Sequence, residues 1–359
     1  MYDIVIIGAG PAGSTLARML DKKYKILLVD KRNLNENIEY HREKCCGGLL
    51  APAAQKILAQ LGLGVPKQVL TGPQMFSVKS IDYDNNIERY YPRHYINIDR
   101  EKLDRWLISI IPKTVEVAFN CIFKSYKEVD DYLEIKLRGN NSDYVVKTKI
   151  LIGADGAISR VREQAFEDSL IPEKYVSIQE WYRTNKNMPY YTSIFDKDIT
   201  DFYSWIIQKD EYLLIGSAIP IKTNVNERFN LLIKKLKKLG YIEGVAYRRT
   251  GTLIMRTRKL GQINAVKGNV ALIGEAAGFI SPSSAEGISY ALESGAVLAE
   301  CINKYSSNFG KEYAKKVKKI KVNIFLKNVK ALLMYNKLTR LVIMKSRILS
   351  INISSGRGI

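Results

Sequence analysis

The chain has 359 residues, 46% of them hydrophobic and 26% charged, a composition that predicts a folded globular protein and argues against disorder. No apolar run approaches the roughly 18 residues of a membrane span, and the four cysteines lack zinc-site spacing, so we expect reduced thiols and no metal. The net charge of +20 is uneven, because residues 304–359 hold 14 basic residues and one acidic residue.

The first 61 residues alternate strands and helices. An apolar run at 3–8 predicts a buried parallel strand rather than a signal peptide, because no basic leader or cleavage site accompanies it, and we therefore expect a cytoplasmic protein. Helical spacing at 11–22 and a second apolar run at 25–30 complete a βαβ unit. A polar loop at 31–50 leads into a predicted helix at 51–61.

Alternation of polar and apolar residues predicts antiparallel strands farther along the chain. The run 74–91 breaks at Asp84-Asn85-Asn86, a hairpin signal, and 175–218 predicts four aromatic-rich strands with one covered face. Buried parallel strands are predicted again at 149–154 and 269–274. The other predicted elements are helices at 100–111, 224–239 and 286–303, a meander at 115–150, and two helices within 309–348.

The motif Gly8-Ala9-Gly10-Pro11-Ala12-Gly13 follows the first strand and opens the first helix. Gly8 permits the tight turn, Gly10 lets the backbone approach a pyrophosphate, and Gly13 allows close packing of helix on strand. Asp30 lies 17 residues after Gly13, at the end of the second strand, where a carboxylate can accept hydrogen bonds from ribose hydroxyls. This context predicts a dinucleotide site, and by itself it leaves FAD and NAD as alternatives.

Two later strands each lead into a glycine and an acidic residue. Asp155-Gly156 follows the strand at 149–154, and Gly274-Glu275 follows the strand at 269–274. With these motifs the chain resembles the flavin-dependent hydroxylases and geranylgeranyl reductases, whose fold resembles that of p-hydroxybenzoate hydroxylase. The resemblance implies that Glu275, where the family usually has Asp, holds the ribityl chain of FAD. It also implies that the helix N-terminus at Gly287-Ile288 faces the isoalloxazine, where its dipole would stabilise the anionic reduced flavin.

The loop Lys44-Cys45-Cys46-Gly47-Gly48 resembles the geranylgeranyl reductase subgroup and, together with residues 49–52, the CbrA-type flavoproteins within it. The resemblance implies that Arg100 contacts FAD, that Cys46 lies beside the flavin ring as the candidate catalytic residue, and that Tyr203 and Trp205 line the substrate cavity. The residues expected to bind FAD are Gly8, Gly10, Pro11, Ala12, Gly13, Asp30, Lys31, Lys44, Cys46, Gly47, Gly48, Arg100, Asp155, Gly156, Gly274, Glu275, Gly287 and Ile288.

These motifs predict an α/β protein with discontinuous domains. The expected architecture is a Rossmann-type FAD-binding domain with a parallel sheet, an inserted substrate domain with an antiparallel sheet, and a helical C-terminus. The predicted boundaries are 1–73, 95–172 and 260–305 for the FAD-binding domain, 74–94 and 173–259 for the substrate domain, and 306–359 for the basic C-terminal segment.

The assigned side chains also have purely structural interpretations. Cys46 could be a packing thiol, although a Cys-Gly-Gly loop has little packing rationale, and a disulfide between the adjacent Cys45 and Cys46 is not expected. Tyr203 and Trp205 point to the same face of a strand and could be an ordinary core pair. Arg100 could cap its own helix or lie along the surface.

The C-terminal segment from Lys311 to Arg347 combines lysine pairs with apolar residues at helical spacing. Three interpretations are open: a solvated helical face, a nucleic-acid-binding surface, and a surface for anionic lipid. No nucleic-acid-binding motif accompanies the charge, so we expect no nucleic-acid partner. Peripheral contact with the inner face of a membrane would suit an enzyme with an isoprenoid substrate.

No Ser/His/Asp arrangement or metal cluster is visible, so the chemistry is expected from the cofactor. The leading hypothesis is an FAD-dependent oxidoreductase in which reduced FAD delivers hydride to a double bond of an isoprenoid or lipid-like substrate. The alternatives are an FAD-dependent monooxygenase of an aromatic or polyketide-like small molecule, and a flavin-containing lipid-binding protein without turnover. NAD(P)H or another external electron donor is expected to reduce the flavin.

Overall fold

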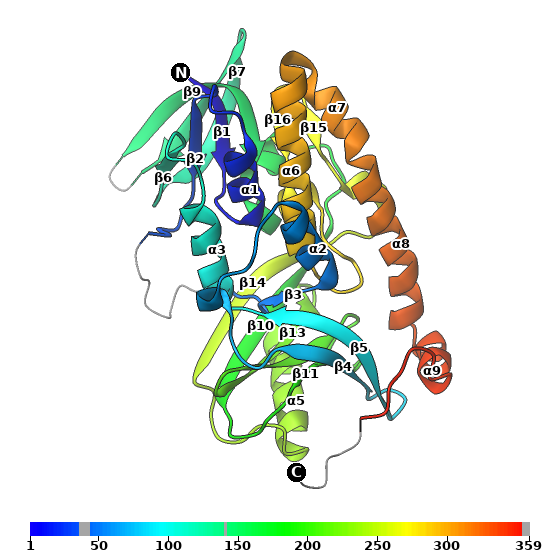
Figure 1. Ribbon diagram of the computed structural model, residues 1–359. Helices are drawn as coiled ribbons and strands as arrows, with labels where there is room; N and C mark the ends of the chain where they lie inside the picture. The colour runs from blue at the N-terminus through cyan, green and yellow to red at the C-terminus, as the bar shows by residue number, and fades with distance from the viewer. Residues whose placement is uncertain (36–43, 140–141, 354–359) are drawn as a thin grey trace.

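Two eight-stranded sheets, one above the other in Figure 1, organise the chain, which the computed structural model describes over residues 1–35, 44–139 and 142–353. The first sheet has the strand order β15-β16-β9-β1-β2-β6, with β8 paired to β9 and β7 to β8. The second has the order β14-β10-β13-β12-β11-β4-β5-β3. The predicted α/β fold class is thereby confirmed.

The first sheet is built on the parallel strands predicted from the apolar runs. β1 lies between β2 and β9 and is parallel to both, and β16 continues the parallel order beyond β9. The bounds are β1 Tyr2–Ile7, β2 Ile26–Val29, β6 Glu116–Ala118, β7 Ile122–Val129, β8 Tyr132–Arg138, β9 Asp143–Gly153, β15 Val266–Lys267 and β16 Val270–Leu272. β6 does not belong to the meander predicted at 115–150, because it pairs in parallel with β2.

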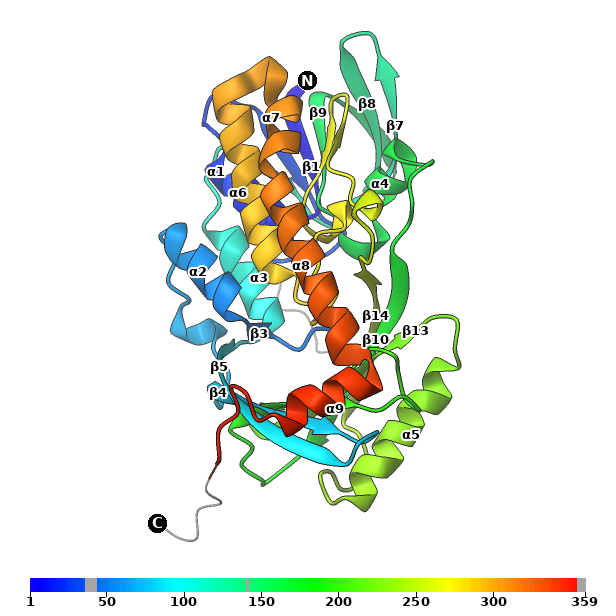
Figure 2. The same ribbon diagram turned by 90° about the vertical axis from the view of Figure 1, so that its right-hand side faces the viewer.

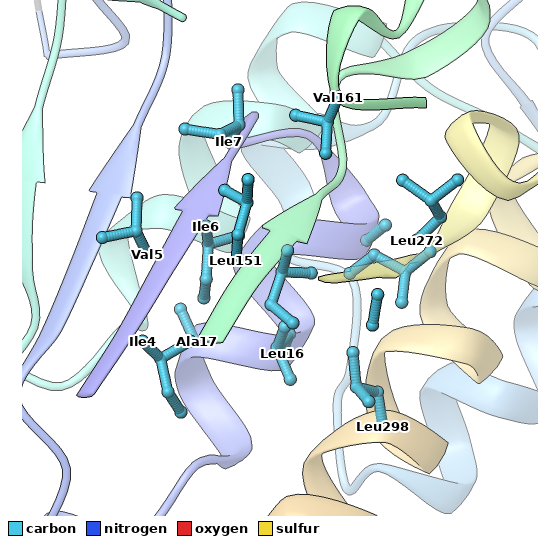
Figure 3. Packing of buried hydrophobic residues seen from close by; sticks show 14 of the residues in the cluster. Ile4, Val5, Ile6, Ile7, Leu16, Ala17, Leu151, Val161, Leu272 and Leu298 are labelled. Atoms are coloured by element: carbon cyan, nitrogen blue, oxygen red, sulfur yellow. The ribbon is translucent and has the colours of Figure 1, made fainter. Parts of the chain in front are cut away.

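Helices α1 (Pro11–Met19) and α6 (Ile288–Tyr305) pack against this parallel sheet. Figure 3 shows Leu16 of α1 and Leu298 of α6 among the side chains that gather at the strands, near Ile6 and Leu151. All four are fully buried. Strands that are apolar along their whole length need cover on both faces, which explains their continuous hydrophobic runs.

The second sheet is mostly antiparallel, with β11 running parallel to β4. The hairpin predicted at Asp84-Asn85-Asn86 is the turn between β4 and β5, and Asn86 adopts a φ of 50° there. Helix α5 (Val225–Lys238) covers one face with its buried apolar side chains. The bounds are β3 Leu49–Leu50, β4 Met75–Asp82, β5 Ile87–Asn97, β10 Glu173–Arg183, β11 Tyr190–Phe195, β12 Ser204–Lys209, β13 Tyr212–Pro220 and β14 Arg248–Arg256.

The C-terminal segment forms three helices, not the two predicted within 309–348. Asn336 has extended backbone, and its side chain accepts hydrogen bonds from the N–H groups of Leu338 and Thr339, so one helix ends there and another begins. α8 runs beside α6 toward the second sheet in Figures 1 and 2. Within the described residues, no helix is long and apolar enough to cross a membrane. The remaining helices are α2 Pro52–Gln60, α3 Arg100–Ser109, α4 Arg160–Ala165, α7 Phe309–Lys316, α8 Lys318–Tyr335 and α9 Lys337–Lys345.

Candidate active site

The loop between β1 and α1 has the shape of an anion-binding turn. Gly8 has a φ of 108°, and a Cβ on Gly13 would lie 1.9 Å from the Gly8 carbonyl oxygen, so both positions require glycine. Gly10 differs, because no described atom lies within 4 Å of a Cβ placed there. Gly10 is also the N-cap of α1 and offers its helix no side-chain hydrogen bond, and Pro11 takes the first helical position. The open side of Gly10 and the free amides of the first turn fit a pyrophosphate.

The close approach of α6 to α1 supports this loop from behind. A Cβ on Gly295 of α6 would lie 2.6 Å from the carbonyl oxygen of Ala12. Ala12 is therefore a packing position of α1, and the missing side chain of Gly295 lets the two helices meet at the Ala12 carbonyl oxygen.

Asp30 ends β2 and is 6% exposed. One of its oxygens accepts a hydrogen bond from the Ala9 N–H at 2.8 Å, which fixes the loop, and both oxygens accept from the Arg32 guanidinium at 3.2 and 3.3 Å. Arg32 also donates to Asp104 at 3.0 Å, and Asp104 accepts from Arg100 at 2.8 Å. Burial alone would lower the pKa of Arg32, but Asp104 and Asp30 raise it. The structure thus connects the predicted residues Asp30 and Arg100 through two residues that were not predicted.

Lys31, which was predicted to bind FAD, is exposed, and its neighbour Arg32 makes the ion pair with Asp30. Arg100 and Asp104 stand four residues apart on a predicted helix, a spacing that could have indicated their contact. The partnership of Arg32 with Asp104 has no such local signal, because the two lie 72 positions apart in the chain.

Cys45 and Cys46 have different surroundings although they are adjacent. The Cys45 thiol donates to the Ser177 carbonyl at 3.4 Å, and burial raises the pKa of this thiol to about 11, so it is unreactive at neutral pH. The Cys46 sulfur accepts a hydrogen bond from the Gly48 N–H at 3.4 Å. Cys46 also lies close enough to Tyr203 to interact with it electrostatically. Of the two thiols, Cys46 is the one on the side of Tyr203 and Trp205.

Lys209, at the end of β12, clamps this loop and was missed by the sequence reasoning. Its ammonium donates to the carbonyl oxygens of Gly48 and Ile98 at 2.9 and 2.8 Å, and to the side-chain oxygen of Asn97 at 2.5 Å. Burial lowers the pKa of Lys209 to about 7. A Cβ on Gly48 would lie 2.6 Å from the Lys209 nitrogen, and one on Gly47 would lie 2.9 Å from Ile207. The second sheet therefore requires glycine at position 48, where a Cβ would also lie 2.4 Å from the Ile98 carbonyl oxygen, whereas at position 47 only the flexible end of Ile207 would have to move.

The two predicted strand-end carboxylates each keep one oxygen unused by the backbone. Asp155 caps α4 by accepting from the Arg160 N–H at 2.9 Å, while its other oxygen is buried without a hydrogen-bond partner among the described residues. Burial raises the pKa of Asp155 to about 6. Glu275 accepts from the Met255 N–H at 2.9 Å through one oxygen. An unpaired buried carboxylate oxygen is costly and fits a hydroxyl-bearing ligand such as the ribityl chain.

Lys44 and Arg100 lie near enough to Glu275 to interact with it electrostatically. Burial raises the pKa of Glu275, and the positive charges of Lys44 and Arg100 oppose that rise. Gly156 and Gly274 follow their strands with φ values of 80° and 59°. The structure thus brings together lysine, arginine and glutamate residues that are separated by more than 50 positions in the sequence.

The N-terminus of α6 lies beyond the loop that follows Glu275. Gly287 is the N-cap of this 18-residue helix and supplies no side-chain hydrogen bond. In the first turn, the Ser289 N–H donates to the Glu286 carboxylate at 3.4 Å, which places a negative charge at the positive end of the helix. Among the described residues, no cluster of His, Cys, Asp or Glu could hold a metal ion.

Tyr203 immediately precedes β12, and Trp205 lies within the strand, with the two rings side by side. Trp205 is 6% exposed and lies over its cross-strand partner Gly216, where a Cβ would fall 2.3 Å from the indole. Its N–H is buried without a hydrogen-bond partner within the described chain. The Tyr203 ring centroid is 5.5 Å from that of Trp205, and the Tyr203 hydroxyl donates to the Ser284 carbonyl at 2.7 Å, just before α6. The buried residues around this aromatic pair are Met75, Tyr175, Phe202, Ile207, Leu214 and Ala218.

Residues 1–238 match the FAD binding domain family. Protein CbrA of Escherichia coli O6:H1 is 39% identical over 330 residues, which cover 92% of this chain and 89% of that protein. Protein CbrA of Shigella sonnei has the same identity, with 92% of each chain covered.

Solved structures share the fold. A geranylgeranyl bacteriochlorophyll reductase-like protein of Thermoplasma acidophilum has a TM-score of 0.79 at 19% identity, covering 100% of this chain and 94% of that one. PqsL of Pseudomonas aeruginosa, solved in complex with 2-aminobenzoylacetate, has a TM-score of 0.72 at 16% identity, covering 97% and 99%. The two proteins bear names of different function, so the fold by itself selects no reaction.

Proposed function

The chain belongs to the CbrA-like family of FAD-dependent oxidoreductases, and from that premise we propose that it reduces a carbon–carbon double bond of an isoprenoid or lipid-like substrate. The observation that carries the proposal is the buried aromatic cluster around Tyr203 and Trp205, next to the loop of Cys46. Largely apolar surroundings with few polar groups suit a substrate that is itself mostly hydrocarbon.

The residues present fit FAD. The amides around Gly10 would hold the pyrophosphate, and the free oxygens of Asp155 and Glu275 would hold the ribityl hydroxyls. Asp30 would shape the phosphate loop through the Ala9 N–H, because donors from Ala9 and Arg32 already occupy both of its oxygens. The N-terminus of α6 at Gly287 would face the flavin ring. When bound and reduced, FAD supplies the hydride, and NAD(P)H or another external donor supplies the electrons.

The chain's own residues would position the substrate and complete the proton balance. Tyr203 is held by its hydrogen bond to the Ser284 carbonyl, so its ring presents a fixed apolar face beside Trp205. Saturation of a double bond needs a proton in addition to a hydride, and we assign that proton to the Cys46 thiol. The sulfur accepts its hydrogen bond from Gly48, which leaves its own hydrogen free to be donated.

The test is anaerobic single turnover. The purified yellow protein would be photoreduced and mixed with geranylgeranyl diphosphate or with a polar lipid extract. Return of the oxidised flavin spectrum, with a gain of two hydrogen atoms per reduced bond in the substrate, is the expected result.

Two other results would contradict the proposal. Oxygen uptake that depends on a substrate, with an oxygen atom gained in the product, would make the protein a monooxygenase. Bound lipid that never reoxidises the reduced flavin would make it a lipid-binding protein without turnover.

A further inference from the structure

Helix α8 has two apolar faces on opposite sides. The inner face packs on the protein through Ile320, Ile324 and Ala331, which are at most 6% exposed. The outer face is bare, and six apolar residues on it are between 45% and 73% exposed. We call these residues the outer stripe: Val322, Phe325, Leu326, Val329, Leu332 and Leu333. Their spacing of three and four positions places them along one line of the helix.

Basic residues border the outer stripe. Lys318, Lys319 and Lys330 are exposed on α8, and Lys337 is exposed at the start of α9. Lys330 also lies near enough to Arg93 and Lys327 to interact with their positive charges, so positive charge is crowded here. The whole segment from residue 304 to 359 holds 14 basic residues against the single acid Glu312.

A buried ion pair holds the end of this surface in place. Arg340 of α9 contacts Asp82 and Asp84 at 2.7 Å each, and Arg340 and Asp82 are at most 2% exposed. On the same helix Leu338 and Val342 point outward, 70% and 67% exposed. Figure 2 shows α8 passing into α9 along one side of the molecule. The apolar residues therefore extend over two helices anchored to the second sheet.

We propose that the outer stripe and its bordering lysines form a docking surface for an anionic lipid bilayer. The apolar side chains would enter the boundary between headgroups and acyl chains, and the lysines would face the lipid phosphates. A second copy of this chain would bring the same positive charge and be repelled. Nucleic acid would attract the lysines but would offer nothing to aliphatic side chains at the centre of the surface.

The same helix connects this surface to the aromatic cluster. Tyr335 ends α8, its hydroxyl donates to the Ser283 carbonyl at 2.9 Å, and its ring centroid lies 5.2 Å from that of Phe202. A bilayer bound to the outer stripe would therefore lie on the opposite side of α8 from the proposed substrate site. The docking inference does not depend on the proposed function, although this last consequence does.

The test is flotation of the full-length, FAD-containing protein with vesicles. We expect binding to vesicles that contain phosphatidylglycerol, much weaker binding to pure phosphatidylcholine, and weakening of the former as salt is raised. The double variant Leu326→Gln/Leu332→Gln should lose at least about tenfold in partitioning, because two apolar side chains no longer enter the bilayer. Lys318→Glu/Lys319→Glu should also bind less and lose much of the salt dependence.

A matched control lies on another basic helix. Leu239 and Val245 are 54% and 87% exposed beside the lysine-rich end of α5, so Leu239→Gln/Val245→Gln removes the same kind of side chain from a similarly charged surface. That variant should bind vesicles like the parent. All six altered residues are exposed, and flavin content with the melting temperature would verify the fold.

Three results would overturn the inference. The first is that the parent protein fails to bind phosphatidylglycerol vesicles at low salt, and the second is that the α5 control loses as much binding as the α8 variant. The third is that gel filtration without lipid shows a dimer that the α8 variant abolishes, which would make this face an interface between copies.

Discussion

The two glycine-containing loops expected to meet FAD are built in different ways. The loop at 8–13 takes its shape largely from its own ends, since Gly13 approaches the carbonyl of Gly8 and the Ala9 N–H bonds to Asp30. The loop at 44–48 takes its shape from the second sheet, through the three hydrogen bonds of Lys209. Glycine is required in both loops, for a local reason in the first and for a long-range reason in the second.

This difference affects how each loop should respond to change. A side chain at an open position of the first loop should block the ligand and leave the fold intact. A change in the clamp of the second loop should alter stability and the flavin environment together, because the same hydrogen bonds hold the loop against β12 and the end of β5 in the second sheet.

The largest effect is expected from Gly10→Val. The position has no described neighbour within 4 Å of a Cβ and a backbone φ of −73°, so valine fits the protein but would occupy the space of the pyrophosphate. Flavin content should fall at least about tenfold, while the melting temperature of the FAD-free protein stays near that of the parent. The absorbance ratio of flavin to protein measures the first, and a thermal melt measures the second.

Gly13→Val is the control for that experiment. Its Cβ would clash with the Gly8 carbonyl, so this variant should lose the fold as well as the flavin. Full flavin content in Gly10→Val would show that the pyrophosphate lies elsewhere.

An intermediate effect is expected from Lys209→Met. Methionine fills much of the volume but leaves the acceptors of Gly48, Asn97 and Ile98 without their donor, which should cost about 2 kcal/mol of unfolding free energy. Denaturant unfolding would measure the loss. Lys267→Met, at an exposed position, should change the unfolding free energy little.

The pH dependence of the same residue has a definite sign. Burial lowers the pKa of Lys209 from 10.5 to about 7, so between these values the unfolded chain binds more protons than the folded protein. Stability contributed by this group should therefore rise as pH increases through that window. The rise should be absent from Lys209→Met, and an identical pH profile in both proteins would show that Lys209 keeps its ordinary pKa.

The smallest effect on flavin content and stability is expected from Cys46→Ala. Loss of a thiol beside the flavin should shift the absorbance maxima slightly, and loss of the proposed proton donor should slow turnover about a hundredfold. Cys45→Ala is a closely matched control, because Cys45 is the next residue but its thiol donates to the Ser177 carbonyl on the second sheet. Equal spectra for the two variants would leave Cys46 as a packing residue.

Much of the fold could be predicted because its signals are local. Apolar runs at 3–8, 25–30, 149–154 and 269–274 became the parallel strands β1, β2, β9 and β16, and Asp84-Asn85-Asn86 became the turn between β4 and β5. A few consecutive residues are enough to predict a strand that is apolar on both faces or a turn that needs a positive φ. The third C-terminal helix was missed because one asparagine, Asn336, ends α8 and caps α9 in a sequence that is otherwise helical throughout.

The residues of the site also differ in whether local sequence signals predict them. Gly8, Gly10, Gly13 and Asp30 stand at fixed distances in one βαβ unit, so their spacing by itself predicted a dinucleotide loop. Sequence spacing could not identify the contacts of Arg32 with Asp104 and of Lys209 with Gly48, or the two faces of α8. Their contacts depend on the order of strands within the sheets and on which side of a helix meets the protein. Sequence spacing reports what one element does with its own residues, and only the tertiary structure decides which distant element fills the space beside it.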